Sequence, residues 1–119
     1  MKPIYLLGLF SVMLFASCSK KDYYPADEYD WMRSHEKGVV AYVDQYTGNF
    51  IVDTDNGFAV IENTGGIFPH KYDGTYAYFS NPGTQSVYNY EGNYFSTIRV
   101  VDSWLTWSDA LYILDQINY

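Results

Sequence analysis

The stretch from Phe50 to Ile61, FIVDTDNGFAVI, carries the strongest fold signal in this chain. Two apolar runs, 50–52 and 58–61, flank a polar centre that ends in the pair Asn56-Gly57. Asn-Gly is the preferred pair where a tight turn between two strands requires positive φ at both central residues. The stretch therefore predicts an antiparallel β-hairpin.

Further strand signals lie on both sides of this hairpin, because runs rich in Val, Ile, Tyr and Phe alternate with turn residues. These runs occupy residues 38–43, 75–79, 86–90 and 94–101. The break at Asn81-Pro82-Gly83 fits either one long bulged strand or two strands joined by a turn. Residues 63–73 have no apolar period and contain Gly65, Gly66 and Pro69, so we expect an irregular connection there.

The period changes after residue 101, where a helix is predicted. Thr106-Trp107-Ser108-Asp109 matches a capping box, in which the threonine oxygen accepts an amide of the first turn. Apolar residues then recur at helical spacing. They are Trp107, Ala110, Leu111, Leu114 and Ile117. We expect this short C-terminal helix to plug one end of the sheet.

The N-terminus has the pattern of an export signal. Lys2 precedes an apolar run at residues 4–16, which is too short to span a bilayer. Small residues, Ala16 and Ser17, stand directly before Cys18, the single cysteine of the chain. These residues resemble a lipobox, in which the signal peptide is cleaved before a cysteine that becomes acylated.

This resemblance implies that residues 1–17 are a lipoprotein signal peptide and that Cys18 carries the lipid. Phe15 stands where most lipoboxes have an aliphatic residue. The implied location is the Gram-negative cell envelope, at the outer membrane, facing the periplasm or the cell surface. The alternative is ordinary secretion with cleavage after Ala16 or Ser17, which would leave a free thiol.

The chain after Cys18 divides into a tether and one small domain. Residues 18–36 are polar and interrupted by Pro25, and residues 37–119 suffice for one modest core. Five strands and a helix predict a mainly β fold, a small five-stranded OB-like barrel with a short C-terminal α-helix. A small β-sandwich is the alternative, since OB folds commonly place a helix between their third and fourth strands and residues 63–73 do not predict one.

Lipobox, tether and strand pattern together resemble the small NigD-like lipoproteins. The resemblance in the domain covers about residues 37–101 and depends on strand content and spacing. It implies a barrel on a lipid anchor and supplies no active-site residues.

The charge of the chain limits its partners. It has 14 acidic and 7 basic side chains and a formal net charge of −7. Nucleic-acid binding needs clustered bases that neutralise phosphates, so we expect no nucleic-acid partner.

Neither catalysis nor a cofactor is predicted, because the chain has no G-x-S-x-G, H-E-x-x-H or glycine-rich phosphate motif. Paired carboxylates across a cleft are the catalytic arrangement that the sequence leaves open. Asp53, Asp55 and Asn56 resemble the start of a calcium loop, but its later ligands are missing. His35 and His70 lack a nearby cysteine or second histidine, so no metal site is predicted.

Aromatic residues are abundant, with 14 Tyr, 7 Phe and 3 Trp. Tyrosine combines an apolar ring with a polar tip, which suits protein interfaces and sugar rings, although aromatic residues also fill cross-strand positions in sheets. The candidate binding residues are Tyr46, Asn49, Phe50, Phe58, Tyr88, Tyr90 and Tyr94. The sequence thus predicts a non-catalytic protein-interaction module on a membrane anchor. The alternatives are a glycan-binding lipoprotein and an immunity-type or structural lipoprotein whose acidic surface meets a basic toxin or peptide.

Overall fold

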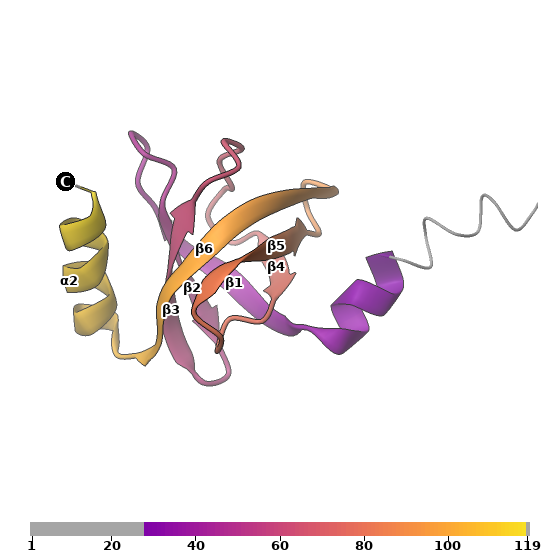
Figure 1. Cartoon of the computed structure of the whole chain (residues 1–119), viewed down its shortest axis with the longest axis horizontal. Coiled ribbons are helices and arrows are strands. Elements are labelled where there is room, and N and C mark those ends of the chain that lie inside the picture. Colours follow the sequence, from indigo (N-terminus) through magenta and orange to yellow (C-terminus); the bar gives the residue numbers. More distant parts are fainter. Residues whose placement is uncertain (1–27, 119) are drawn as a thin grey trace, which may run out of the picture. The chain divides into compact units, whose positions relative to one another are not determined.

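The structure is a computed structural model that describes residues 28–118 (Figure 1). The chain divides into two units, residues 1–31 and 32–119, and the second contains all the strands of the described residues and the C-terminal helix. Residues 28–34, which the sequence places in the tether, are helical. Within the described range, no helix has the length and apolar character needed to cross a membrane.

Six strands form a closed antiparallel barrel in the described part of the chain. They are β1 (Glu36–Val43), β2 (Phe50–Thr54), β3 (Gly57–Asn63), β4 (Gly74–Ala77), β5 (Gly83–Asn89) and β6 (Tyr94–Leu105). Their order around the barrel is β1-β2-β3-β6-β5-β4, and β4 pairs with β1 to close it. The predicted mainly β barrel is confirmed, and a closed sheet replaces the sandwich alternative. The strand number is six rather than five, because the break at 81–83 separates β4 from β5.

The predicted hairpin is confirmed as the pair β2 and β3. Its register runs from Phe50 opposite Ile61 to Thr54 opposite Gly57. Thr54 closes the turn, since its hydroxyl donates to the Gly57 carbonyl at 2.8 Å and accepts the Asn56 amide at 3.1 Å.

The prediction that both central residues of that turn have positive φ is wrong. The two residues between the strands are Asp55 and Asn56, and neither has a positive φ. Gly57 alone has one, at +107°, in the region that favours glycine. The asparagine therefore lies inside the turn, and the glycine begins β3.

The β2–β3 hairpin is buried on both faces. Side chains alternate across a strand, so Phe50 and Val52 point into the barrel while Ile51 points outward. Helix α2 (Trp107–Ile117) contacts β2, β3 and β6 and covers this outward face. The helix therefore packs against the side of the barrel and does not plug its end. The buried apolar cluster between α2 and the outer face of the barrel comprises Ile51, Val60, Ala110 and Leu114.

Both ends of α2 are held by side chains. The predicted N-cap is confirmed, because the Thr106 hydroxyl accepts the Asp109 amide at 3.2 Å. At the other end, the Asn118 side-chain oxygen accepts the Asn49 amide group at 2.9 Å and the Thr47 hydroxyl at 3.3 Å. The helix thus runs from the end of β6 to the connection between β1 and β2.

Gly57→Val should destabilise the barrel more than Gly66→Val, as measured by urea denaturation. Both glycines have positive φ, so both substitutions should cost roughly 1–3 kcal/mol of backbone strain. A Cβ at Gly57 would also lie 3.0 Å from the Leu105 carbonyl oxygen, whereas a Cβ at Gly66 would meet nothing within 4 Å. Equal losses of stability would show that the hairpin does not lie against β6 as described.

Candidate binding site at the loop end of the barrel

Three connections meet at one end of the barrel, toward the top of Figure 1. They join β1 to β2 (44–49), β3 to β4 (64–73) and β5 to β6 (90–93). The strands are antiparallel, so alternate connections lie at the same end. The Tyr90 amide donates to the Gly74 carbonyl at 2.9 Å and joins the β5–β6 connection to the first residue of β4. We call this region the loop end.

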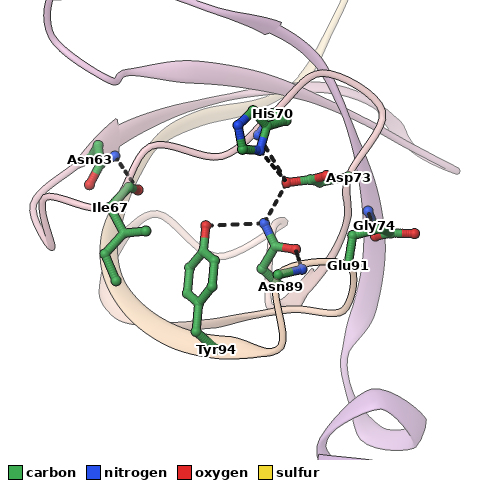
Figure 2. Close-up of polar contacts among 9 residues, drawn as sticks. Asn63, Ile67, His70, Asp73, Gly74, Asn89, Glu91 and Tyr94 are labelled. Atoms are coloured by element: carbon green, nitrogen blue, oxygen red, sulfur yellow. Dashed lines mark hydrogen bonds and ion pairs between the residues drawn. The ribbon is translucent and has the colours of Figure 1, made fainter.

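A buried polar network holds the loop end together (Figure 2). The Asn89 amide group donates to the Asp73 carboxylate at 2.8 Å and to the Tyr94 hydroxyl at 3.2 Å. The Asn89 side-chain oxygen accepts the Gly92 amide at 2.8 Å. The same Asp73 oxygen also accepts the His70 backbone amide at 2.9 Å. One buried carboxylate and one buried amide therefore join the β3–β4 and β5–β6 connections.

The titratable groups of this network have structural partners. Burial raises the pKa of the Tyr94 hydroxyl; repulsion from Asp73 adds to this, and the Asn89 hydrogen bond opposes it. Tyr94 is thus protonated at neutral pH. The His70 ring is largely exposed, and its Nδ1 lies 4.0 Å from the Asp73 carboxylate. Asp73 is oriented by amide donors, which suits it to holding the loops.

Asn63 shapes the β3–β4 connection from within. Its side-chain oxygen accepts the Gly65 and Gly66 amides at 3.1 and 3.0 Å. Its amide group donates to the Gly48 and Ile67 carbonyls at 3.2 and 2.9 Å. This one side chain therefore fixes the irregular segment and attaches it to the β1–β2 connection.

Asp44 fixes the β1–β2 connection in a similar way. Its carboxylate accepts the Thr47 hydroxyl at 2.6 Å and the Thr47 amide at 2.9 Å. These two bonds lower the pKa of Asp44 below its usual value. They stabilise the turn that presents Tyr46 to solvent.

The interior of the loop end is filled. The space left there is about 10 Å³, roughly the volume needed for one water molecule. Ile67 and Pro69 line it from the β3–β4 connection, and Phe50 lines it from below. The Ser96 hydroxyl oxygen, which also lines it, is buried and has no hydrogen-bond partner. A ligand of this end would therefore bind on its outer surface.

That outer surface carries large apolar side chains. The exposed ones are Tyr46, Ile67, Phe68, Tyr72 and Tyr90. Tyr46 is 95% exposed. Tyr72 has a φ of +78°, an unfavourable value for a bulky residue, and its amide donates to the Val40 carbonyl at 2.8 Å. The Lys71 ammonium lies 5.2 Å from the centre of the Tyr72 ring.

The loop end brings together five of the seven predicted binding residues. Tyr46 and Tyr90 are exposed, and Tyr94 is half-buried in the polar network. Asn49 and Phe50 are buried and have structural contacts: Asn49 accepts the Asn63 amide at 2.8 Å, and Phe50 belongs to the core.

The other two predicted residues lie elsewhere. Phe58 packs beside α2, with its ring centre 5.0 Å from that of Trp107. Tyr88 is buried on the outer face of β5 against Phe95, at 4.8 Å between ring centres, and its hydroxyl donates to Asn93. The seven residues therefore do not form a single surface.

The sequence analysis missed Ile67, Phe68 and Tyr72 at this end. Their signal was three large apolar residues inside a segment that otherwise predicts a polar connection. From sequence, residues 63–73 were predicted to be an irregular connection, and no binding role was predicted for them.

Two other groups of residues were considered as sites from sequence. Between residues 28 and 118, no three His, Cys, Asp or Glu side chains are grouped so that they could hold a metal ion. Asp53, Asp55 and Asn56 form the hairpin turn and its approach. Cys18 lies outside the described residues.

Comparisons with protein-family models, with curated proteins and with solved structures find no match for this chain.

Proposed function

We propose that this chain is a membrane-anchored envelope lipoprotein of the NigD-like kind. In this proposal the barrel acts as a non-catalytic protein-interaction module whose contact surface is the loop end. The observation that supports it most is the exposure of Tyr46, Tyr72 and Tyr90 on connections whose backbones are fixed by hydrogen bonds, among them the buried bond between Asp73 and Asn89.

A fixed backbone matters because binding normally loses free energy in ordering loops and side chains. Tyrosine adds contact area with few rotatable bonds and can donate one hydrogen bond at its tip. Ile67 and Phe68 of the β3–β4 connection add exposed apolar side chains at the same end of the barrel. Such a surface suits a folded partner protein better than an ion or a small polar molecule.

The proposed anchor is the lipid on Cys18, supported by Lys2, the apolar run at 4–16 and the small residues before the cysteine. The proposed location is the outer membrane of a Gram-negative cell, facing the periplasm or the surface. An acidic barrel on such a tether would meet soluble or membrane-bound partners.

Cys18→Ser should abolish lipid attachment, because it removes the only thiol of the chain. Metabolic labelling with a clickable fatty acid should mark the wild type and leave the variant unmarked. The wild type should fractionate with membranes. Label that persists on Cys18→Ser would contradict the proposed anchor.

Site-specific photo-crosslinking in the native envelope should identify a partner at the loop end. A photoreactive phenylalanine analogue in place of Tyr46, Tyr72 or Tyr90 should give the same discrete protein adduct. The analogue in place of Tyr112, which is 66% exposed on α2, is the matched control and should give none.

Adducts of equal yield from all four positions would show that the loop end is not selective. A glycan partner would give no protein adduct, and Tyr46→Ser and Tyr90→Ser would then reduce binding to immobilised envelope polysaccharide. That result would contradict the protein-interaction proposal and favour the glycan alternative.

A further inference from the structure

The β2–β3 turn presents a reactive dipeptide, Asn56-Gly57. An asparagine side chain can be attacked by the backbone nitrogen of the residue that follows it. The attack is easiest when that residue is glycine, which has no Cβ to obstruct a close approach. Asparagine occurs at seven positions in the chain, and only Asn56 is followed by glycine. The sequence therefore singles out one asparagine for this reaction.

The surroundings of Asn56 leave the reacting groups open to water. Asn56 is an exposed residue in the short turn between β2 and β3. Its side-chain nitrogen donates to the Glu36 carboxylate at 3.2 Å, in an exposed bond at the long end of the normal range. An exposed bond on a turn opens readily, so the Asn56 side chain can turn toward the Gly57 nitrogen.

The asparagines nearest to Asn56 along the chain are held more firmly. The Asn63 side chain binds four backbone groups through its oxygen and its nitrogen. Asn49 is buried; its side-chain oxygen accepts the Asn63 amide and its nitrogen donates to Asn118. A larger residue than glycine follows each of them. Sequence and structure thus both favour reaction at Asn56.

Glu36 makes the Asn56 side chain part of a junction between three segments. The Glu36 Oε1 atom accepts the Ser80 amide at 2.8 Å, and its Oε2 atom accepts the Ser80 hydroxyl at 2.9 Å as well as the Asn56 side-chain nitrogen. Glu36 begins β1, Ser80 lies in the β4–β5 connection, and Asn56 lies in the hairpin turn. One carboxylate therefore joins these segments at the end of the barrel opposite the loop end.

We propose that Asn56 is a site of deamidation and that the acid formed there releases Glu36 from the hairpin turn. The Gly57 nitrogen attacks Asn56 Cγ and loses its proton, which closes a cyclic imide. The Cγ–Nδ2 bond breaks, and the departing nitrogen takes up a proton and leaves as ammonia. Water then adds across one of the two C–N bonds of the imide and gives aspartate or isoaspartate. The net change exchanges one water molecule for one ammonia molecule.

The product reverses the contact with Glu36. An N–H donor that binds the Glu36 carboxylate becomes a second carboxylate, which has no proton to donate at neutral pH. The two carboxylates repel each other, and isoaspartate also adds one carbon to the backbone of the turn. Arg33 precedes β1 at the same end of the barrel, so a pairing of the new carboxylate with Arg33 is the competing outcome. This site is separate from the loop end and does not depend on its function.

The modification is tested by ageing the full chain at mildly alkaline pH and mapping it by mass spectrometry. Trypsin should release residues 38–71 as one peptide, since its only lysine is the last residue and it has no arginine. This peptide contains Asn49, Asn56 and Asn63 and so carries its own controls. Conversion from amide to acid should be about tenfold faster at Asn56 than at the other two, a barrier lower by about 1.4 kcal/mol. Equal rates at all three, or no conversion at Asn56, would overturn the proposal.

The release of Glu36 is tested by substitution. Asn56→Asp should have a thermal midpoint of unfolding about 2–5 °C below that of Asn56→Ala, the shift expected for repulsion between two exposed charges in a small domain. In the Glu36→Gln background, Asn56→Asp should leave the midpoint unchanged, because the glutamine nitrogen donates to the new carboxylate while its oxygen still accepts the Ser80 amide.

Equal midpoints for Asn56→Asp and Asn56→Ala would contradict the release of Glu36, and they are the result expected if Arg33 neutralises the new carboxylate. A midpoint that falls equally with and without Glu36→Gln would also contradict it, because the cost of the new charge would then not come from Glu36.

Discussion

The double burial of the β2–β3 hairpin is the constraint on which the rest of this structure depends. Ile51 and Val60 are fully buried outside the barrel, while Phe50, Val52 and Ile61 are buried within it. Burial of each aliphatic side chain contributes roughly 1.5–3 kcal/mol, so the outward face needs α2 as its cover. Alternation alone does not fix the register of a strand that is apolar on both faces. The close contact of Gly57 with the β6 backbone supplies a second restraint.

Because the loop end is filled, a ligand at this end would bind on its outer surface. The space inside the loop end holds about one water molecule, and the connections at the two ends of the barrel present different side chains. At the loop end, a buried Asp73–Asn89 pair fixes segments that expose tyrosines. At the other end, a bulge in β6 holds the exposed Trp104 at a positive φ of +61°. Each end combines a fixed backbone with exposed aromatic rings, which is the arrangement that pre-organises a binding surface.

The sequence predicted local features well because short-range chemistry determines them. Residues 50–61 indicated the hairpin, and Thr106 indicated the helix start. The sequence did not decide whether residues 81–83 were a bulge or a turn, since the same residue types occur in both. Apolar spacing indicated the face of α2 that contains the buried Ala110 and Leu114, but Trp107 and Leu111 of the predicted stripe are exposed. The spacing did not show which surface the helix covers. Asp73 and Asn89 meet only because β4 lies between β1 and β5, a long-range pairing with no local signal.

Hydrogen–deuterium exchange of the full chain, resolved by residue, tests most directly whether the loop end is a fixed surface. The Gly66, Tyr72 and Gly92 amides should exchange far more slowly than in an unfolded chain, because each donates to an acceptor in the fold. The Ile51 amide, in the doubly buried strand, provides the reference for full protection. Exchange of those three amides at unfolded rates, with Ile51 still protected, would contradict a pre-organised loop end.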